Sequence, residues 1–188
     1  MNKRILKTEN GNTDNNQIWF EGMAKYVNTI SLGGFPMHRN FEYKEYYKNG
    51  KIMIERYDNF IGVSKILFNN KKQTTLSKIT GKEIERIKTY EQPPIKIEKI
   101  DRKHIKIKGH KCIKVIHSTY TDSTETKSIH WVDESYAIPF AEGRIAEVPK
   151  GLVVKGEVWA QNNEINFSYT IELKEIKKKE VSDSNFKL

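Results

Sequence analysis

Apolar and polar residues alternate along most of this chain, and the alternation predicts β-strands with one buried and one wet face. The clearest run lies in 164–175, where every second residue from Ile165 to Leu173 is apolar. Short polar turns such as Lys48-Asn49-Gly50 separate the runs. The strands and hairpins expected from this pattern are 18–26, 39–57 as one hairpin, 62–68 with 73–79, 95–100 with 103–108, 112–120 with 127–133, and 152–160 with 164–175.

About ten strands joined by short turns favour a mainly β fold, in which a single curved antiparallel sheet runs as a half-barrel meander. One short helix is expected over 81–90, ending before Pro93-Pro94, which block its continuation. The segment 136–150 contains Pro139 and Pro149 and is the longest candidate loop. We expect the helix and this loop to cover the concave face of the sheet, because a curled sheet needs its apolar side covered.

The length of 188 residues suits one domain. We assign 18–188 to that domain and interpret the polar stretch 1–17 as a flexible tether or an expression remnant. No apolar run approaches the ~20 residues of a membrane-spanning helix. The basic N-terminus also lacks the apolar stretch of a signal peptide. The sequence therefore predicts a protein that is either cytoplasmic or exported with its signal already removed.

The chain is strongly basic, with a net charge of +9 and a pI near 9.4. Its lysines interleave with apolar residues, as in Ile105-Lys106-Ile107-Lys108, which is typical of the outer face and the edge of a sheet. A nucleic-acid or anionic-surface binder is the alternative interpretation. The sequence shows no helix-turn-helix, zinc-finger spacing or RNP-like aromatic motif. We therefore predict no nucleic-acid partner.

The only cysteine, Cys112, lies two residues after His110 and five before His117. A zinc site could combine Cys112 and His110, on one strand face, with His130 on a neighbouring strand. A cysteine nucleophile would need a nearby base, but strand parity puts His117 on the opposite face. The alternative is a small buried side chain. Because no motif of a hydrolase, nucleotide-binding loop or dinucleotide fold is present either, the sequence predicts a non-catalytic protein without cofactor or metal.

Aromatic residues on the predicted strands are better candidates for a binding site than Cys112 and its neighbouring histidines. They either fill the core or line an apolar groove on the concave face that would hold an acyl chain or a peptide. Both interpretations remain open at this point. The candidate ligand-binding residues are Trp19, Phe41, Tyr43, Trp131, Ile138, Trp159, Phe167 and Tyr169.

Several segments, in this order, are similar to bacterial envelope proteins. IWFEGMAKY (18–26) and EYKEYYKNGKIMIERY (42–57) resemble the opening hairpin of lipoprotein-carrier half-barrels. IKGHKCIKV (107–115) and KSIHWVDESYAIPFAEG (127–143), with Trp131 and Ile138-Pro139 in step, resemble motifs of the GLPGLI family and its relatives. Residues 148–154 stand where that family has its glycine- and leucine-rich segment. The closing EIKKKEVSDSNFKL also resembles the family's C-terminus.

This resemblance implies a curved half-barrel in the periplasm or at the outer membrane, peripheral to or tethered at a membrane rather than spanning it. The implied partners are a lipid or lipidated, apolar ligand on the concave face. An alternative is a structural role as a scaffolding partner in an envelope protein complex.

Overall fold

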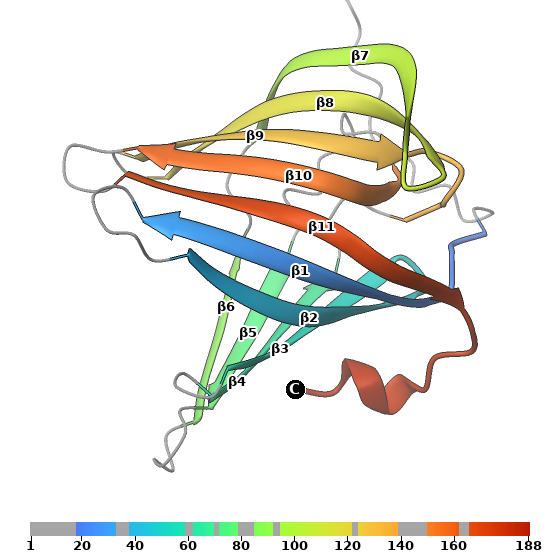
Figure 1. The fold of residues 1–188 in the computed structure, drawn as a ribbon. Helices are drawn as coiled ribbons and strands as arrows, with labels where there is room; N and C mark the ends of the chain where they lie inside the picture. Colours follow the sequence, from blue (N-terminus) through green and yellow to red (C-terminus); the bar gives the residue numbers. More distant parts are fainter. Residues whose placement is uncertain are drawn as a thin grey trace, which may run out of the picture.

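The computed structural model describes residues 18–32, 38–58, 62–69, 72–78, 85–91, 95–121, 124–138, 150–161 and 166–188. Within these residues, eleven antiparallel strands form one sheet (Figure 1), followed by a single turn of 3-10 helix, η1, at Asp183–Phe186. The strands are β1 (Gly22–Leu32), β2 (His38–Lys48), β3 (Lys51–Asp58), β4 (Gly62–Asn69), β5 (Lys72–Lys78), β6 (Glu85–Glu91), β7 (Ile95–Ile107), β8 (His110–Thr121), β9 (Thr124–Asp133), β10 (Leu152–Gln161) and β11 (Asn166–Lys178).

The sheet consists of two meanders that are joined through the first and last strands. Its order is β6-β5-β4-β3-β2-β1-β11-β10-β9-β8-β7, so β1 pairs with β11 along its whole length, from Gly22 opposite Lys178 to Leu32 opposite Phe167. The predicted single antiparallel sheet is confirmed. The pairing of the first strand, β1, with the last strand, β11, is a long-range contact that no local pattern in the sequence predicts.

The two edges of the sheet, β6 and β7, are consecutive in sequence. β6 ends at Glu91 and β7 begins at Ile95, so the connecting chain can span at most about 14 Å. Among the described strands, β6 pairs only with β5, and β7 only with β8. The sheet therefore curls until the ends of its edge strands lie close together, while the edges stay unpaired with each other. Figure 1 shows this curl, with β3 to β6 turning behind β1 and β2.

Local turn chemistry sets several of the hairpins. Asn49 and Gly50 have φ values of 49° and 70° between β2 and β3. Lys108 and Gly109, in the turn between β7 and β8, also have positive φ values, of 50° and 88°. Positive φ at both central residues matches the twist of the flanking strands. The predicted hairpin over 39–57 is confirmed, as are the pairings of β4 with β5, β8 with β9, and β10 with β11.

Two local predictions are wrong. The expected helix over 81–90 is a strand where it is described, because Glu85–Glu91 pairs with β5, placing Leu76 opposite Ile87 and Thr74 opposite Thr89. Sheet pairing here overrides a weak local helical preference. The expected hairpin around Asp101-Arg102 is one continuous strand, β7, whose pairing with β8 is irregular between Asp101 and Ile105. An irregular strand explains polar residues in a run that was interpreted as a turn.

Some predictions fall outside the described residues. These are the N-terminal tether over 1–17, most of the 136–150 loop, namely 139–149, and residues 79–84 of the expected helix. At the described ends of the loop, Ile138 is buried, and the backbone N–H of Gly151 donates to the Ile138 carbonyl at 2.8 Å. Among the described residues, no helix is long and apolar enough to cross a membrane.

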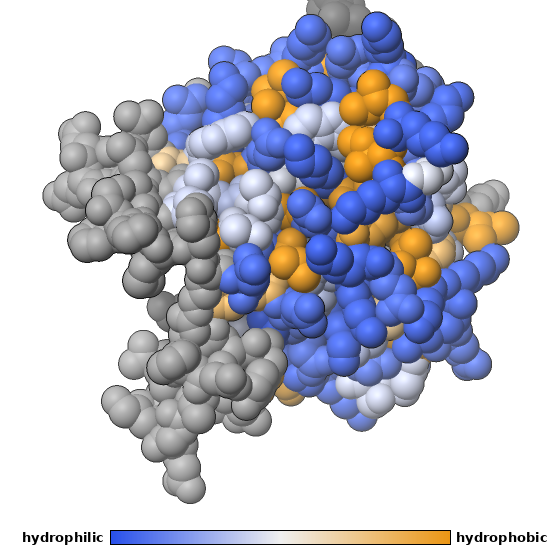
Figure 2. Space-filling view, viewed as in Figure 1, coloured by the Kyte–Doolittle hydropathy of each residue, from blue (hydrophilic) through white to orange (hydrophobic). Residues whose placement is uncertain are grey.

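The outer face of the sheet pairs its basic residues with carboxylates. Lys25 reaches Glu175 at 3.2 Å, and Lys108 reaches Glu172 at 3.0 Å. Figure 2, which shows the side seen in Figure 1, is mostly hydrophilic with scattered hydrophobic spots. Exposed pairs of this kind contribute little stability. This arrangement agrees with lysines that keep the sheet face soluble.

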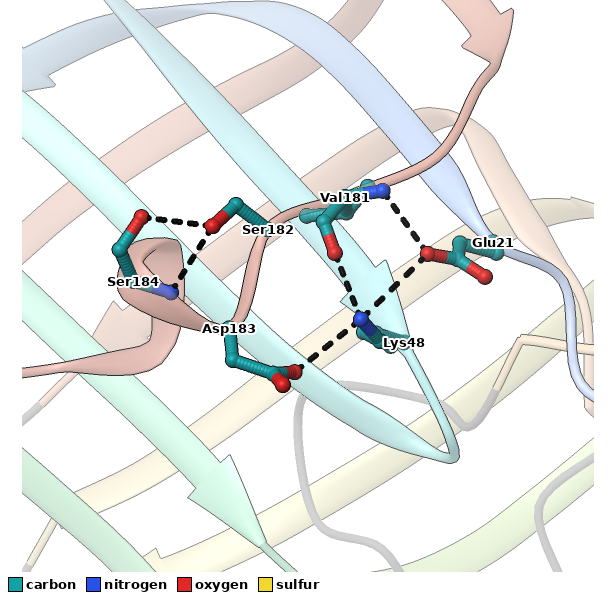
Figure 3. Close-up of polar contacts among 6 residues, drawn as sticks. All are labelled: Glu21, Lys48, Val181, Ser182, Asp183 and Ser184. Atoms are coloured by element: carbon teal, nitrogen blue, oxygen red, sulfur yellow. Dashed lines mark hydrogen bonds and ion pairs between the residues drawn. The ribbon is translucent and has the colours of Figure 1, made fainter.

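The chain end is fastened to the outside of the sheet by a small set of polar contacts (Figure 3). The Nζ of Lys48, at the end of β2, donates to the Val181 carbonyl at 2.8 Å and lies 3.1 Å from Asp183 and 3.8 Å from Glu21. Glu21 in turn accepts from the Val181 N–H at 2.8 Å. Val181 itself is buried, and η1 contacts β3. The segment after β11 therefore covers part of the outer face near β1 to β3.

Candidate ligand-binding cavity

The inner face of the curled sheet encloses a cavity of about 230 Å³. Residues of β1 to β5 line one side, and residues of β9, β10 and β11 line the other. Because strands from both meanders contribute to the same space, it lies inside the curve of the sheet. Ile138 and Gly151, at the two described ends of the 136–150 segment, also line it. The cavity is therefore a product of the sheet's curl.

The wall on the β3–β4 side is apolar. Cross-strand register places Ile52 opposite Phe68 and Ile54 opposite Ile66, so these four side chains form a two-by-two patch on the inner face. Ile52, Ile54 and Phe68 are buried. Ile171 and Val153 face them from the other side of the cavity. This is the kind of surface that accepts a hydrocarbon chain.

A polar chain lies at the β1–β2 side of the same cavity. The Tyr47 hydroxyl donates to Glu45 Oε2 at 2.6 Å, and the Tyr26 hydroxyl lies 3.3 Å from that of Tyr47. All three side chains are buried. Ala24 stands opposite Glu45 and Gly22 opposite Tyr47, so the β1 residue facing each of these two side chains is small. The sequence thus places a carboxylate inside the sheet with two phenols to solvate it.

Burial and the nearby charge keep both phenols neutral. Burial, followed by the negative charge of Glu45, raises the pKa of Tyr26 and that of Tyr47 well above the ordinary value. Tyr26 also stacks on Tyr43, with ring centroids 5.2 Å apart and planes 15° apart, and the Arg56 guanidinium lies 5.2 Å from the centre of the Tyr43 ring. Arg56 is exposed, so the one described cationic side chain of the lining stands towards solvent.

Two further polar groups line the cavity. Asn28 is buried, at 8% exposure, and its Oδ1 has no hydrogen-bond partner in the described part of the chain. His130 is also buried, and its Nδ1 lies 3.0 Å from Nε2 of His117. Burial lowers the pKa of His130 to about 3, so its imidazole is neutral at physiological pH. Gly156 makes room for this ring, since a Cβ there would lie 2.7 Å from His130 Cδ2.

The structure brings some of the predicted ligand residues together and not others. Tyr43 and Ile138 line the cavity. Phe41, opposite Asn28, and Tyr169, opposite Ile30, share the register positions of the inner face. The backbone of Phe167 continues that row, but its side chain lies outside the described part.

The three predicted tryptophans lie elsewhere. Trp131 stands opposite Lys114 and Lys155, whose Nζ atoms lie 5.6 and 4.6 Å from the ring centre. Trp159 is 41% exposed. Trp19 precedes β1, and its ring packs against Gly50 in the β2–β3 turn. Lys150 Nζ lies 4.8 Å from the centre of the same ring.

Sequence reasoning did not predict most polar members of the lining, among them Asn28, Glu45, Tyr47 and His130. For Glu45 a signal existed: in FEYKEYYK every second residue from Phe41 to Tyr47 shares one face, so the aromatic positions on either side of Glu45 place it inside. No comparable signal marks Asn28 or His130, which line one cavity only because β1 pairs with β11 and so joins the two meanders.

Polar groups near Cys112 form a cluster that does not line the cavity, although Cys112 itself packs in the same hydrophobic core as the cavity wall. His110 Nδ1 lies 2.9 Å from Asp133 Oδ2, and Ser135 donates from its hydroxyl to Asp133 Oδ1 at 2.6 Å. Burial raises the pKa of Asp133, but hydrogen bonds from Ser135 and His110 outweigh it and leave that pKa lowered. His130 pairs with His117 instead of joining this cluster. In the described residues, no group of three or more candidate ligands could hold a metal ion.

Cys112 is expected to be unreactive in the folded protein. Burial, and then the charge of Asp133, raise the pKa of its thiol to about 11, and the side chain is inaccessible. At pH 8 we expect iodoacetamide to alkylate the native protein at least tenfold more slowly than the protein in 8 M urea, as followed by intact mass. Equal rates in both conditions would contradict this packing.

Comparison with known proteins finds no matching family model and no matching curated protein sequence. Several solved structures are similar. One is a structure of PNGF-II, at 17% identity and a TM-score of 0.50, where the match covers 88% of this chain and 29% of that chain. Another is a DUF1329 family protein from Desulfovibrio piger, at 8% identity and a TM-score of 0.47, with 90% of each chain covered. A third is an outer membrane lipoprotein-sorting protein domain from Vibrio parahaemolyticus, at 8% identity and a TM-score of 0.44, again with 90% of each chain covered.

Identities this low concern the fold alone. This chain also spans less than a third of the PNGF-II chain. The class that the structure defines is thus an open, strongly curved antiparallel sheet with a cavity inside its curve. The resemblance of the sequence motifs to the GLPGLI family stays a prediction.

Proposed function

We propose that this protein is a non-catalytic binding protein of the cell envelope that holds an apolar ligand, such as an acyl chain or the lipid part of a lipidated cargo, in the cavity on its concave face. The observation that carries the proposal is the cavity itself: about 230 Å³ inside the curve of the sheet, with an isoleucine- and phenylalanine-rich wall. Protein interiors are densely packed and apolar space left unfilled in a core costs stability, which supports the proposal that a ligand occupies this space.

The surroundings of the cavity support binding over chemistry. The one cysteine is buried in the core and does not line the cavity, and burial raises the pKa of its thiol. Burial also keeps the cavity histidine, His130, neutral by lowering its pKa. Neither group is poised as a nucleophile or as a base near neutral pH. The envelope location, periplasmic or at the outer membrane, rests on the resemblance of the motifs and belongs to the same proposal.

A tryptophan that fills the cavity should weaken ligand binding. At ~30 Å³ per water molecule, the volume corresponds to about eight waters, so an eight-carbon chain is a suitable probe. We expect Ile66→Trp, which projects into the cavity from β4, to weaken binding of octan-1-ol at least tenfold in native mass spectrometry or calorimetric titration. The matched control is Lys65→Trp, the adjacent residue on the opposite face of β4, which should bind as the wild type does.

The proposal would be overturned if octan-1-ol, octylamine and octanoate all failed to bind the wild-type protein at millimolar concentration. It would also be overturned if Ile66→Trp and Lys65→Trp bound equally well. Thermal unfolding of both variants establishes that they are folded before the titrations are compared.

A further inference from the structure

We infer that the cavity selects amphiphiles whose head group donates hydrogen bonds, above all a primary ammonium, over those with a carboxylate head. This inference rests on the proposed function and assigns the chemistry of the ligand's polar end. It depends on three observations at the β1–β2 side of the cavity: the direction of the tyrosine hydrogen bonds, the buried Asn28 oxygen and the placement of charge.

The tyrosine hydrogen bonds point towards the carboxylate. Tyr47 has a single hydroxyl proton, and at 2.6 Å from Glu45 Oε2 it donates that proton to the carboxylate. The 3.3 Å contact between the two phenols must then be donated by Tyr26, with the Tyr47 oxygen accepting. Both hydroxyl protons therefore point along the chain towards Glu45. On this side of the cavity, these three residues therefore present hydrogen-bond acceptors and negative charge to a ligand, and no hydrogen-bond donors.

Asn28 supplies a second acceptor independently. It sits on β1 between Phe41 of β2 and Ile171 of β11, lines the cavity, and is more than nine-tenths buried. Its Oδ1 has no hydrogen-bond partner among the described residues. A buried acceptor without a donor costs free energy, and a ligand that brings the donor recovers it. Among the described lining residues, Asn28 therefore carries the one buried side-chain oxygen that lacks a hydrogen-bond donor.

The charges of the lining point the same way. Glu45 is buried, whereas Arg56 is exposed and engages the face of Tyr43. A charge in a buried site acts strongly, and an exposed one is screened by solvent. Glu45 and Asn28 stand four residues apart along the paired strands, with Tyr26 and Tyr43 between them, so an ammonium head at the β1–β2 side would meet one or the other. Its hydrocarbon chain would lie against the β3–β4 wall. A carboxylate head would meet the negative end of the hydroxyl chain.

Three eight-carbon probes that differ only in the head group test this inference. We expect octylamine to bind the wild-type protein at least tenfold more tightly than octanoate at pH 7, with octan-1-ol between them, because a hydrogen bond to a charged partner is lost with the carboxylate. Glu45→Gln keeps the shape and removes the charge, so it should lower the amine-to-octanoate ratio about tenfold. Asn28→Leu, which removes the acceptor at similar volume, should weaken octylamine binding and serves as the second variant if Glu45→Gln does not fold.

The matched control is Glu55→Gln, which removes a carboxylate from the outer side of the adjacent strand and should leave the ratio unchanged. Octanoate binding as tightly as octylamine, or a ratio unaffected by both Glu45→Gln and Asn28→Leu, would overturn the inference while leaving the proposed function standing. If instead octanoate binds best and Arg56→Gln removes that preference, the head group lies at the rim beside Arg56. Failure of all three probes would overturn the proposed function itself.

Discussion

Gly22→Ala is expected to destabilise the protein by about 3 kcal/mol, at the upper end of the usual cost of overpacking a core. Gly22 is buried in β1, between Tyr47 of β2 and Lys178 of β11. A Cβ at this position would collide with the backbone carbonyl of Lys177 and come within 2.6 Å of the Phe20 ring. The ring could turn aside, but the carbonyl belongs to the strand that joins the two meanders. Urea unfolding followed by tryptophan fluorescence measures the loss.

Gly109→Ala is the matched control for this substitution. A Cβ at Gly109 would meet nothing within 4 Å, but its φ of 88° is unfavourable for alanine. It should cost only about 1 kcal/mol, through backbone conformation alone. A Gly22→Ala protein within 0.5 kcal/mol of the wild type would mean that β1 and β11 do not approach as closely as described.

The second large effect is a loss of stability as the pH falls from 6.5 to 5, a range that lies above the ordinary pKa of most carboxylates. Burial lowers the pKa of His130 to about 3 in the folded protein, whereas an unfolded histidine titrates near its ordinary value of about 6.5. Between these two values the unfolded chain binds the proton more readily. The free energy of unfolding therefore falls as pH falls, by about 1.4 kcal/mol for each unit. Between pH 7 and 5 the expected loss is about 2 kcal/mol.

Between pH 5 and 6.5, the change in stability that comes from His130 can be separated from the effect of the acidic residues. Hydrogen bonds, from Ser118 first, lower the pKa of Glu98, and Asp133 is likewise lowered, so stability linked to these carboxylates is lost only below about pH 4.5. His130→Asn retains a hydrogen-bonding group opposite His117 but cannot titrate, and it should flatten the slope of stability between pH 5 and 6.5. His104→Asn, at an exposed position of β7, should leave the slope in place. An unchanged slope in His130→Asn would show that another group controls acid sensitivity.

Local sequence predicted the hairpins well because two-residue turns and alternation act over a few residues. Asn49-Gly50 accepts positive φ without strain, and the alternating pattern of the flanking strands then sets their register. The same reasoning failed at Glu85–Glu91, where pairing with β5 decides the conformation. It also failed at Asp101-Arg102, where polar residues lie within a continuous but irregular strand rather than at a turn.

The candidate site was predictable only in part, for the same reason. Alternation along β2 identifies Tyr43 as an inner-face residue, and it could have identified Glu45 in the same way. Register shifts, between Lys25 and Tyr26 in β1 and between Val153 and Lys155 in β10, change which residues face inward beyond them. Parity counted from the sequence is therefore unreliable across these points.

By itself, the sequence determined that this protein is an antiparallel β protein of short hairpins with a lysine-rich outer face, since those properties follow from turn residues and period-two alternation. Only the tertiary structure decided that β1 pairs with β11, that β6 and β7 end close together, and that Asn28, Glu45 and His130 line one cavity. The physical reason is distance along the chain. Bringing together strands more than a hundred residues apart depends on the accumulated twist and curl of the whole sheet, which no short segment specifies.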